Sequence, residues 1–325
     1  MIEWISATKR VMTTNANLTG IRRVVTGVDG SESALHAALW AAREAQSRGV
    51  PLTLEHAMHL PESAVAPLEP DDFAERQQAA GRELVEAVAA RIRERHPGLG
   101  VEAEISPLSP IHRLIQVSAP DVLVVTGTRG HGGFAGMLLG SVSRALAAHA
   151  NGPLVVVRGP EPEDTQGMVI LGVGLEPDES AIDYAFDAAR RHGVPLSAVR
   201  AWSPAVPMPA IGMPGATAFG LGEPGALFMP ESVDSDEDEA ADAARAVEPV
   251  RLRYPGVPLT ISSAVGNTVP VLVEAGVGAR LIVVGAHRHR GPFSVGAGYV
   301  VEGLLSHSPV PVAVIPIASA DDDEV

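Results

Sequence analysis

The chain of 325 residues contains no cysteine, few aromatic residues and few positive charges. The absence of cysteine excludes disulfides and thiolate metal sites, and we expect the protein to be cytoplasmic. Aromatic residues make up only 4% of the chain, so its cores must be built from small aliphatic side chains. Lysine and arginine number 24 against 39 acidic residues, and the net charge of -15 repels nucleic acid and anionic lipid. No apolar run approaches the ~18–20 residues that span a bilayer. We therefore expect neither nucleic acid nor a membrane as a partner.

The sequence contains an internal duplication. Residues 27–30 and residues 172–174 each follow a short run of Val, Ile and Leu, and each leads into an alanine-rich helical pattern. Residues 121–127 and 279–285 also correspond, and the paired segments are separated by about 145–160 residues throughout. The chain therefore consists of two copies of one unit, with the boundary near residues 159–165.

Each unit alternates short apolar runs with helical patterns. Continuous apolar runs indicate strands that are buried on both faces, as in a parallel sheet covered by helices. In the first unit we predict strands near 22–28, 51–58, 100–106, 121–127 and 153–158, and helices near 32–48, 71–96, 109–118 and 140–150. The fold class is therefore α/β, with two tandem, doubly wound, five-stranded parallel sheets of the Rossmann-like type. Such sheets bind ligands at the carboxyl ends of their strands, where the strand order reverses.

The remaining segments differ from this pattern in composition. Residues 203–230 are rich in Pro, Gly and Met, and we interpret them as a mobile linker or lid, with a partner-binding segment as the alternative. The predicted organisation is a flexible N-terminal tail at 1–20, a first domain at 21–160, a second domain at 166–318 that contains the insertion at 203–230, and an acidic tail at 319–325.

The stretch from 127 to 143 carries the clearest chemical signal. It begins where a buried strand ends, contains six glycines, and runs into a helix at Gly140 and Ser141. Glycines let backbone amides approach a phosphate closely, and the N-terminus of a helix attracts anions. The hydroxyl groups of Ser141 and Ser143 can add donors. A glycine-rich turn that binds nothing is the alternative, which the position between strand and helix disfavours. The stretch matches neither a Walker A loop nor the dinucleotide fingerprint.

This stretch resembles the ATP-binding signature of the universal stress protein family, Gly-x2-Gly-x9-Gly-(Ser/Thr), at Gly127, Gly130, Gly140 and Ser141. The first strand, which ends at residues 28–31, resembles the opening motif of the same family. The resemblance covers both units and nearly the whole chain, in the tandem form of the family. It implies the adenine nucleotide alpha hydrolase-like form of the Rossmann-like fold.

The resemblance also implies roles for individual residues. Asp29, at the end of the first strand, would contact the nucleoside, and Ala57 would line the adenine pocket. The phosphates would be held by the loop and the helix start, at Gly127, Arg129, Gly130, Gly140, Ser141, Val142 and Ser143. Asp29 has a second interpretation, because an aspartate before Gly-Ser is also a good turn former beside a helix N-cap. The nearby glycine-rich loop favours binding.

The second copy departs from the signature. When the copies are aligned on their last strands, Asp29, Gly130 and Ser141 correspond to Gly174, Arg288 and Tyr299, whereas the glycines at 285 and 298 are kept. An arginine side chain would block the close approach of a phosphate to the backbone. We therefore predict a degenerate second site. The basic run at 287–290 is interpreted as a solvated loop, with an anion site as the alternative.

These observations predict an ATP-binding universal stress protein that acts as a nucleotide-dependent regulatory or stress-response module. No catalytic residue and no metal ligand is assigned. A slow ATPase, with Mg²⁺ holding the phosphates, and a nucleotide-free interaction scaffold stay open as alternatives. The strands at 154–157 and 311–315 are apolar and need covering, so we expect the two units to pair with each other as an intrachain pseudo-dimer. A dimer of chains is compatible with this arrangement.

Overall fold

The computed structural model describes residues 20–58, 72–130, 138–160, 167–203, 235–287 and 297–317. The predicted N-terminal tail at 1–20, the insertion at 203–230 and the acidic tail at 319–325 lie almost entirely outside the described residues. The interpretations of these three segments stay predictions.

The first unit alternates strands and helices along its described part. Its elements are β1 (Arg23–Gly27), α1 (Glu32–Arg48), β2 (Leu52–Ala57), α2 (Asp72–Arg95), β3 (Val101–Ser106), α3 (Pro110–Val117), β4 (Val122–Gly127), α4 (Ser141–His149) and β5 (Leu154–Val157). Each predicted strand and helix of this unit is present, with ends within a residue or so of the predicted ones.

The second unit repeats the same order of elements. They are β6 (Val169–Gly172), α5 (Glu179–His192), β7 (Leu196–Trp202), α6 (Asp236–Arg251), β8 (Leu259–Val265), α7 (Thr268–Ala275), β9 (Leu281–His287), α8 (Tyr299–His307) and β10 (Val312–Ile317). The structure therefore shows the duplication that the sequence indicates.

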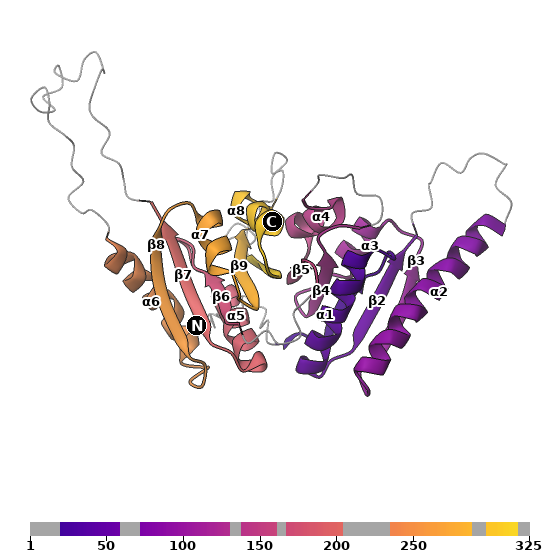
Figure 1. The fold of residues 1–325 in the computed structure, drawn as a ribbon, viewed down its shortest axis with the longest axis horizontal. Helices are drawn as coiled ribbons and strands as arrows, with labels where there is room; N and C mark the ends of the chain where they lie inside the picture. The colour runs from indigo at the N-terminus through magenta and orange to yellow at the C-terminus, as the bar shows by residue number, and fades with distance from the viewer. Residues whose placement is uncertain are drawn as a thin grey trace, which may run out of the picture.

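The strands form one ten-stranded sheet in the order β3-β2-β1-β4-β5-β10-β9-β6-β7-β8 (Figure 1). Within each unit the pairing is parallel, whereas β5 and β10 pair antiparallel, with Val155 opposite Ala313. The two predicted sheets are thus continuous, because the apolar last strand of each unit covers the last strand of the other. This pairing is the one that the sequence predicts.

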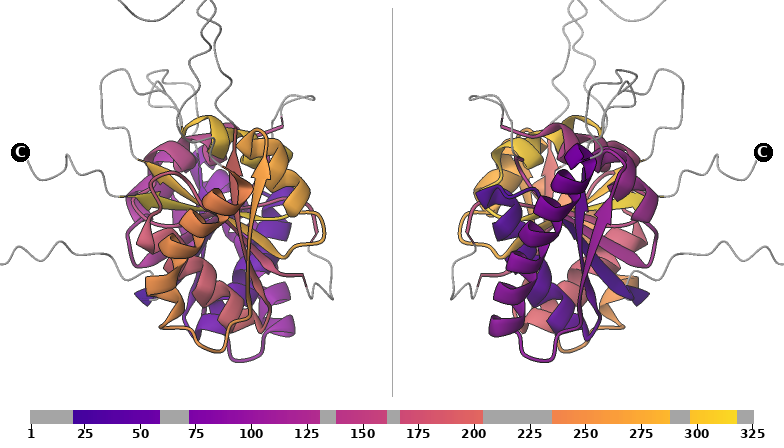
Figure 2. Two further views of the ribbon diagram at one scale, coloured as in Figure 1. Left: turned by 90° about the vertical axis from the view of Figure 1, so that its left-hand side faces the viewer. Right: turned by 90° about the vertical axis from the view of Figure 1, so that its right-hand side faces the viewer.

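Helices cover both faces of the sheet (Figure 2). One buried apolar cluster joins the sheet to α1, α2, α5 and α6, and a second cluster joins the other face to α3, α4, α7 and α8. Each cluster contains residues from both units. The two units therefore share their cores as well as their sheet, and the α/β fold class predicted from the sequence is confirmed.

Local signals explain where the helices begin and end. Ser31 caps α1 by accepting a hydrogen bond from the amide of Ala34 at 3.1 Å. Gly49 and Gly193 end α1 and α5 in the left-handed region, with φ of 66° and 65°. A residue with a side chain is strained in that conformation, which is why the repeated Gly-Val-Pro segment stops each helix. Ser235 begins the acidic helix α6 with a capping box.

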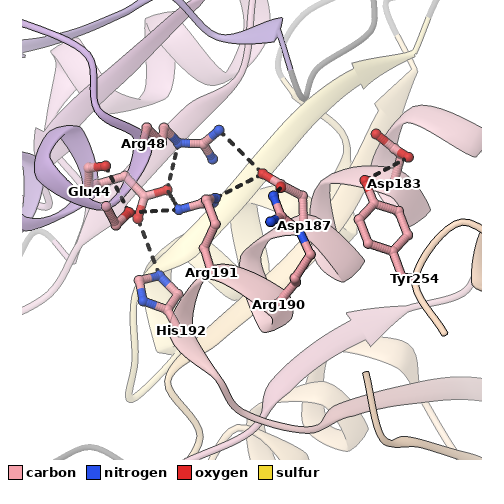
Figure 3. Close-up of polar contacts among 9 residues, drawn as sticks. Glu44, Arg48, Asp183, Asp187, Arg190, Arg191, His192 and Tyr254 are labelled. Carbon is pink, nitrogen blue, oxygen red and sulfur yellow. Dashed lines mark hydrogen bonds and ion pairs between the residues drawn. The ribbon is translucent and has the colours of Figure 1, made fainter. Parts of the chain in front are cut away.

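A buried group of charges joins α1 of the first unit to α5 of the second (Figure 3). We call Glu44, Arg48, Asp187 and Arg191 the interface quartet. Glu44 lies 2.9 Å from Arg48 Nε and 2.8 Å from Arg191 Nη1, and Asp187 lies 2.8 Å from Arg191 Nε and 3.5 Å from Arg48 Nη1. His192 extends the group, with Nε2 at 3.2 Å from Glu44. Each unit thus supplies one carboxylate and one guanidinium.

The interface quartet is shielded from water. Its four side chains are between 3% and 7% exposed. Burial alone would raise the pKa of the Glu44 carboxyl, but the charges of Arg48 and Arg191 outweigh burial and hold that pKa well below its ordinary value. The pKa of Asp187 is lowered in the same way, against burial, chiefly by Arg191. Both carboxyl groups are therefore ionised inside the interface.

Candidate functional site

The candidate site lies at the carboxyl edge of the first unit, between β1 and β4. The order β3-β2-β1-β4-β5 reverses at this point, because the chain leaves β1 toward β2 on one side and reaches β4 on the other. Such a switch point leaves a crevice beyond the strand ends. β1 leads directly to Asp29 and β4 leads directly to the glycine-rich loop. The topology therefore brings together two segments that are separated by about a hundred residues of chain.

Asp29 and Gly130 lie against each other. Asp29 Oδ1 accepts a hydrogen bond from the amide of Ser31 at 2.9 Å. A Cβ atom added at Gly130 would overlap Asp29 Oδ2. The carboxylate thus forms the turn that its sequence context predicts, and it also faces the loop. A residue with a side chain at position 130 would therefore require the Asp29 carboxylate to move.

Gly127 makes a second close approach, to the first turn of α1. A Cβ atom at Gly127 would overlap the Oγ and the carbonyl oxygen of Ser33, and Ser33 Oγ also accepts from the amide of Arg129 at 3.4 Å. Ser33 is a site residue that the sequence reasoning missed. The pattern Ser-Glu-Ser directly after Asp29 and Gly30 is the signal that could have revealed it, because it places two hydroxyl groups at a helix start.

The glycine at the start of α4 faces the same edge. Gly140 is the N-cap residue of α4, has no side chain to cap the helix, and donates its amide to the carbonyl of Thr128 at 2.7 Å. Ser141, the first helical residue, is exposed, and Val142 is partly buried. The first amides of a helix have no partner within that helix and favour a negative charge. The structure therefore places a positive helix end beside the loop, as the sequence predicts for this segment.

Ser143 occupies a different environment from Ser141. Its Oγ donates to the carbonyl of Gly127 at 2.7 Å, receives a hydrogen bond from Thr126 Oγ1 at 3.3 Å, and is buried. In this conformation the hydroxyl ties α4 to the end of β4. The predicted contact between Ser143 and a phosphate would require this hydroxyl to change partner.

Ala57 and Arg129 complete the predicted set. Ala57 ends β2, next to β1, and is partly buried at the same edge of the sheet. Arg129 is exposed, between Gly127 and Gly130. The part of the loop at 131–137 lies outside the described residues.

His56 was not singled out from the sequence. Its Nδ1 lies 2.7 Å from the carbonyl oxygen of Val28, the residue before Asp29. A carbonyl oxygen only accepts, so Nδ1 is the protonated nitrogen. A Cβ atom at Gly81 of α2 would lie 2.7 Å from the imidazole Cδ2, so that glycine makes room for the ring. His56 therefore supports the turn that carries Asp29.

The second unit fills the equivalent place with an ion pair. Arg200 of β7 is 6% exposed, donates from Nη1 to the carbonyl of Gly174 at 3.0 Å, and pairs through Nε with Glu239 of α6. Gly174 is the residue that corresponds to Asp29. In the second unit, the guanidinium of Arg200, paired with Glu239, therefore lies where the first unit has the imidazole of His56 near the carboxylate of Asp29.

The helix start of the second unit also differs. Gly298 is the N-cap of α8 and has a φ of 85°, whereas Gly140 has a φ of -73°. Tyr299 follows it and is 78% exposed. Arg288, which corresponds to Gly130, lies outside the described residues. The predicted loss of the second site stays a prediction, and these differences are compatible with it.

Among the residues that the structure describes, no group of three or more His, Cys, Asp or Glu side chains could hold a metal ion. In the same part of the chain, no helix has the length and apolar character needed to cross a membrane.

Comparison with known proteins identifies relatives over about nine tenths of the chain. The model of the universal stress protein family matches residues 20–158 and again residues 168–316. Two universal stress proteins of Mycobacterium tuberculosis strain H37Rv, Rv2623 and Rv2005c, are 33% and 30% identical over 302 and 300 residues. These alignments cover 89% and 90% of this chain and 95% and 96% of those proteins.

A solved structure supports the same fold. The crystal structure of a universal stress protein from Archaeoglobus fulgidus DSM 4304 aligns with a TM-score of 0.64 and 17% identity, over 93% of this chain and 99% of that one. At this level of identity the match establishes the fold alone. The resemblance inferred from the glycine-rich loop is confirmed by the family match.

Proposed function

Because the chain belongs to the universal stress protein family and carries its domain twice, we propose that it is an ATP-binding regulatory or stress-response protein whose first unit binds the nucleotide. The proposal assigns the nucleotide site to the domain at 21–160 and a degenerate site to the domain at 166–318. It makes the protein at most a slow ATPase.

The contact between Asp29 and Gly130 carries the proposal. Asp29 Oδ2 takes up the space that a Cβ atom at position 130 would need, so the bare backbone of Gly130 lies directly beside a carboxylate. A ribose hydroxyl group can donate to such a carboxylate, whereas a phosphate needs the bare backbone of the glycines. The uncapped start of α4 at Gly140 supplies amides and a positive dipole end for the phosphates. These residues fit an adenine nucleotide with its phosphates toward α4.

The second unit supports the asymmetry of the proposal. Gly174 has no carboxylate to offer, and its carbonyl already accepts from Arg200. A nucleoside at this edge would have to displace a buried guanidinium from both Gly174 and Glu239. Displacing one partner of a buried pair leaves the other charge without compensation, which is strongly unfavourable.

The test is to identify and count the bound nucleotide. The wild-type chain is purified without added nucleotide and denatured, the released molecules are identified by mass spectrometry, and binding of added MgATP is measured by calorimetry. Gly130→Asp places a bulky negative group against the Asp29 carboxylate. Gly174→Asp is the control for added charge, because it places the same charge in the second unit, at the position that corresponds to Asp29, where a Cβ atom meets nothing within 4 Å.

We expect ATP at about one molecule per chain from the wild type and from Gly174→Asp, and none from Gly130→Asp. Two molecules per chain would contradict the asymmetry. A wild type that releases no nucleotide and binds no added MgATP would refute ATP binding and leave an interaction scaffold as the better account. Release of phosphate from MgATP, measured on the same samples, decides whether any hydrolysis accompanies binding.

A further inference from the structure

Arg158 lies between the candidate phosphate loop and the second unit. It is the first residue after β5, and the preceding residue, Val157, accepts a hydrogen bond from the amide of Thr128 at 3.1 Å. The backbone of Arg158 is therefore next to the start of the glycine-rich loop. Its side chain is partly buried.

The guanidinium group of Arg158 contacts both units. Its Nη2 donates to the carbonyl oxygens of Leu305 at 2.9 Å and Ser306 at 2.8 Å, which belong to the last turn of α8 in the second unit. The same nitrogen lies 3.5 Å from the carbonyl oxygen of Leu138, two residues before the helix start at Gly140. The last carbonyls of a helix have no partner within it and favour a cation. The end of α8 therefore holds this side chain beside the loop.

The positive charge at this place comes from two arginines, Arg129 and Arg158. Within the described ranges, no ion pair joins Arg129 or Arg158 to a carboxylate, although Arg48 and Arg191 of the interface quartet are both paired. Burial, and then the charge of Arg129, lower the pKa of Arg158. Two arginines thus repel each other next to a glycine-rich loop in a chain with 39 acidic residues. A bound polyanion would relieve that repulsion.

The second unit has a different residue at the position that corresponds to Arg158. Gly127 pairs with Val157 in the first unit, and Gly285 pairs with Ile315 in the second. The residue that corresponds to Arg158 is therefore Pro316, which carries no charge and no donor. At these two corresponding positions, the arginine lies at the edge where the nucleotide signature is complete.

We propose that Arg158 is a positioning residue through which the second unit supports triphosphate binding by the first. The carbonyls of α8 hold its guanidinium against the segment before Gly140, where it fixes the loop and adds positive charge at the phosphate end of the site. This inference rests on the proposed function. It gives the degenerate unit a role, and it predicts that the site distinguishes a nucleoside triphosphate from a monophosphate through a contact between the units.

The experiment compares MgATP and AMP as probes. Calorimetry on the full chain gives both dissociation constants for the wild type, for Arg158→Met, which keeps the length of the stem, and for Arg158→Lys, which keeps the charge. The melting temperature is recorded for each. His192→Gln is the matched control, because it removes another contact between the units, the one of 3.2 Å between His192 Nε2 and Glu44. This contact lies near the C-terminal ends of α1 and α5, which precede β2 and β7, and is therefore away from the loop.

For Arg158→Met we expect the affinity for MgATP to fall about tenfold and the affinity for AMP to change less than about threefold. Arg158→Lys should recover part of the difference, and His192→Gln should keep the wild-type ratio. Equal losses for both nucleotides that follow the melting temperature would indicate a merely structural role and overturn the inference. An unchanged ratio in both Arg158 variants would also overturn it. A wild type that binds neither nucleotide would instead refute the proposed function, and the inference with it.

Discussion

Replacing Glu44 by glutamine removes one negative charge from the interface quartet while keeping the shape of the side chain. In the native protein this carboxylate is 3% exposed and serves Arg48, Arg191 and His192 at 2.9, 2.8 and 3.2 Å. The two guanidinium groups are 4% and 7% exposed, so water cannot replace the lost charge. After the change, both would share the single carboxylate of Asp187.

The expected loss follows from these contacts. Breaking a buried ion pair by removing one partner costs about 3–5 kcal/mol, because the other charge stays buried without compensation. The amide oxygen of glutamine can still accept one hydrogen bond from Arg48 or Arg191, which is worth about 1 kcal/mol. We therefore expect Glu44→Gln to lower the free energy of unfolding by about 2–4 kcal/mol.

Urea unfolding followed by circular dichroism measures this loss. Glu86→Gln is the control, because Glu86 pairs with Arg93 at 3.3 Å while both side chains are about half exposed, at 61% and 46%. Surface pairs of this kind contribute about 0–1 kcal/mol. The double variant Glu44→Gln/Arg191→Gln restores neutrality and should cost less than the sum of its parts. If Glu44→Gln unfolds at the same urea concentration as Glu86→Gln, the reasoning about the interface quartet is wrong.

Three further outcomes are expected. Gly81→Ala should lower the melting temperature, because its Cβ atom would lie 2.7 Å from the ring of His56. This effect should outweigh the preference of alanine for helix, which is worth about 1 kcal/mol. A higher melting temperature would contradict the close packing. Arg200→Met should destabilise the protein by about 2–3 kcal/mol, since Glu239, whose side chain is only 12% exposed, would lose its partner. Arg245→Met, at an exposed pair, should change stability by less than about 0.5 kcal/mol. The pKa values of the Glu44 and Asp187 carboxyl groups are lowered from 4.5 and 3.8. Their contribution to the free energy of unfolding is therefore complete above about pH 4.5 and is lost as the pH falls toward their folded pKa values. Melting curves that are identical at pH 7 and pH 3 would exclude this contribution.

The sequence predicts the elements of the first unit closely because each signal there is local. Buried runs such as residues 122–127 indicate a strand wherever they lie in the chain, and Gly49 ends a helix through its own backbone. The parallel topology then places the carboxyl ends of β1 and β4 at the same edge of the sheet, where Asp29 meets Gly130. For these features no knowledge of distant contacts is needed.

The remaining features depend on contacts between distant residues, which spacing does not encode. Glu44 and Arg48 are four residues apart on one helix, a pattern that is typical of a solvent-exposed pair. Their burial depends on a second helix, α5, whose Asp187 is 139 residues after Arg48 in the sequence. Ser143 shows the same limitation, because its hydroxyl could face a ligand or the carbonyl of Gly127, and only the packing of α4 decides.

The antiparallel join between β5 and β10 has a consequence for how such a chain can diversify. In a dimer of identical subunits, every substitution appears twice, so a change that improves one site alters the other in the same way. Covalent linkage of the two units removes that constraint while the strand pairing keeps them together. Arg158 can therefore be matched to the end of α8 without a symmetric copy at Pro316. The join also occupies both apolar strands, which leaves β3 and β8 as the edges of the sheet. An association of whole chains would have to use a different surface from the one that unites the two halves.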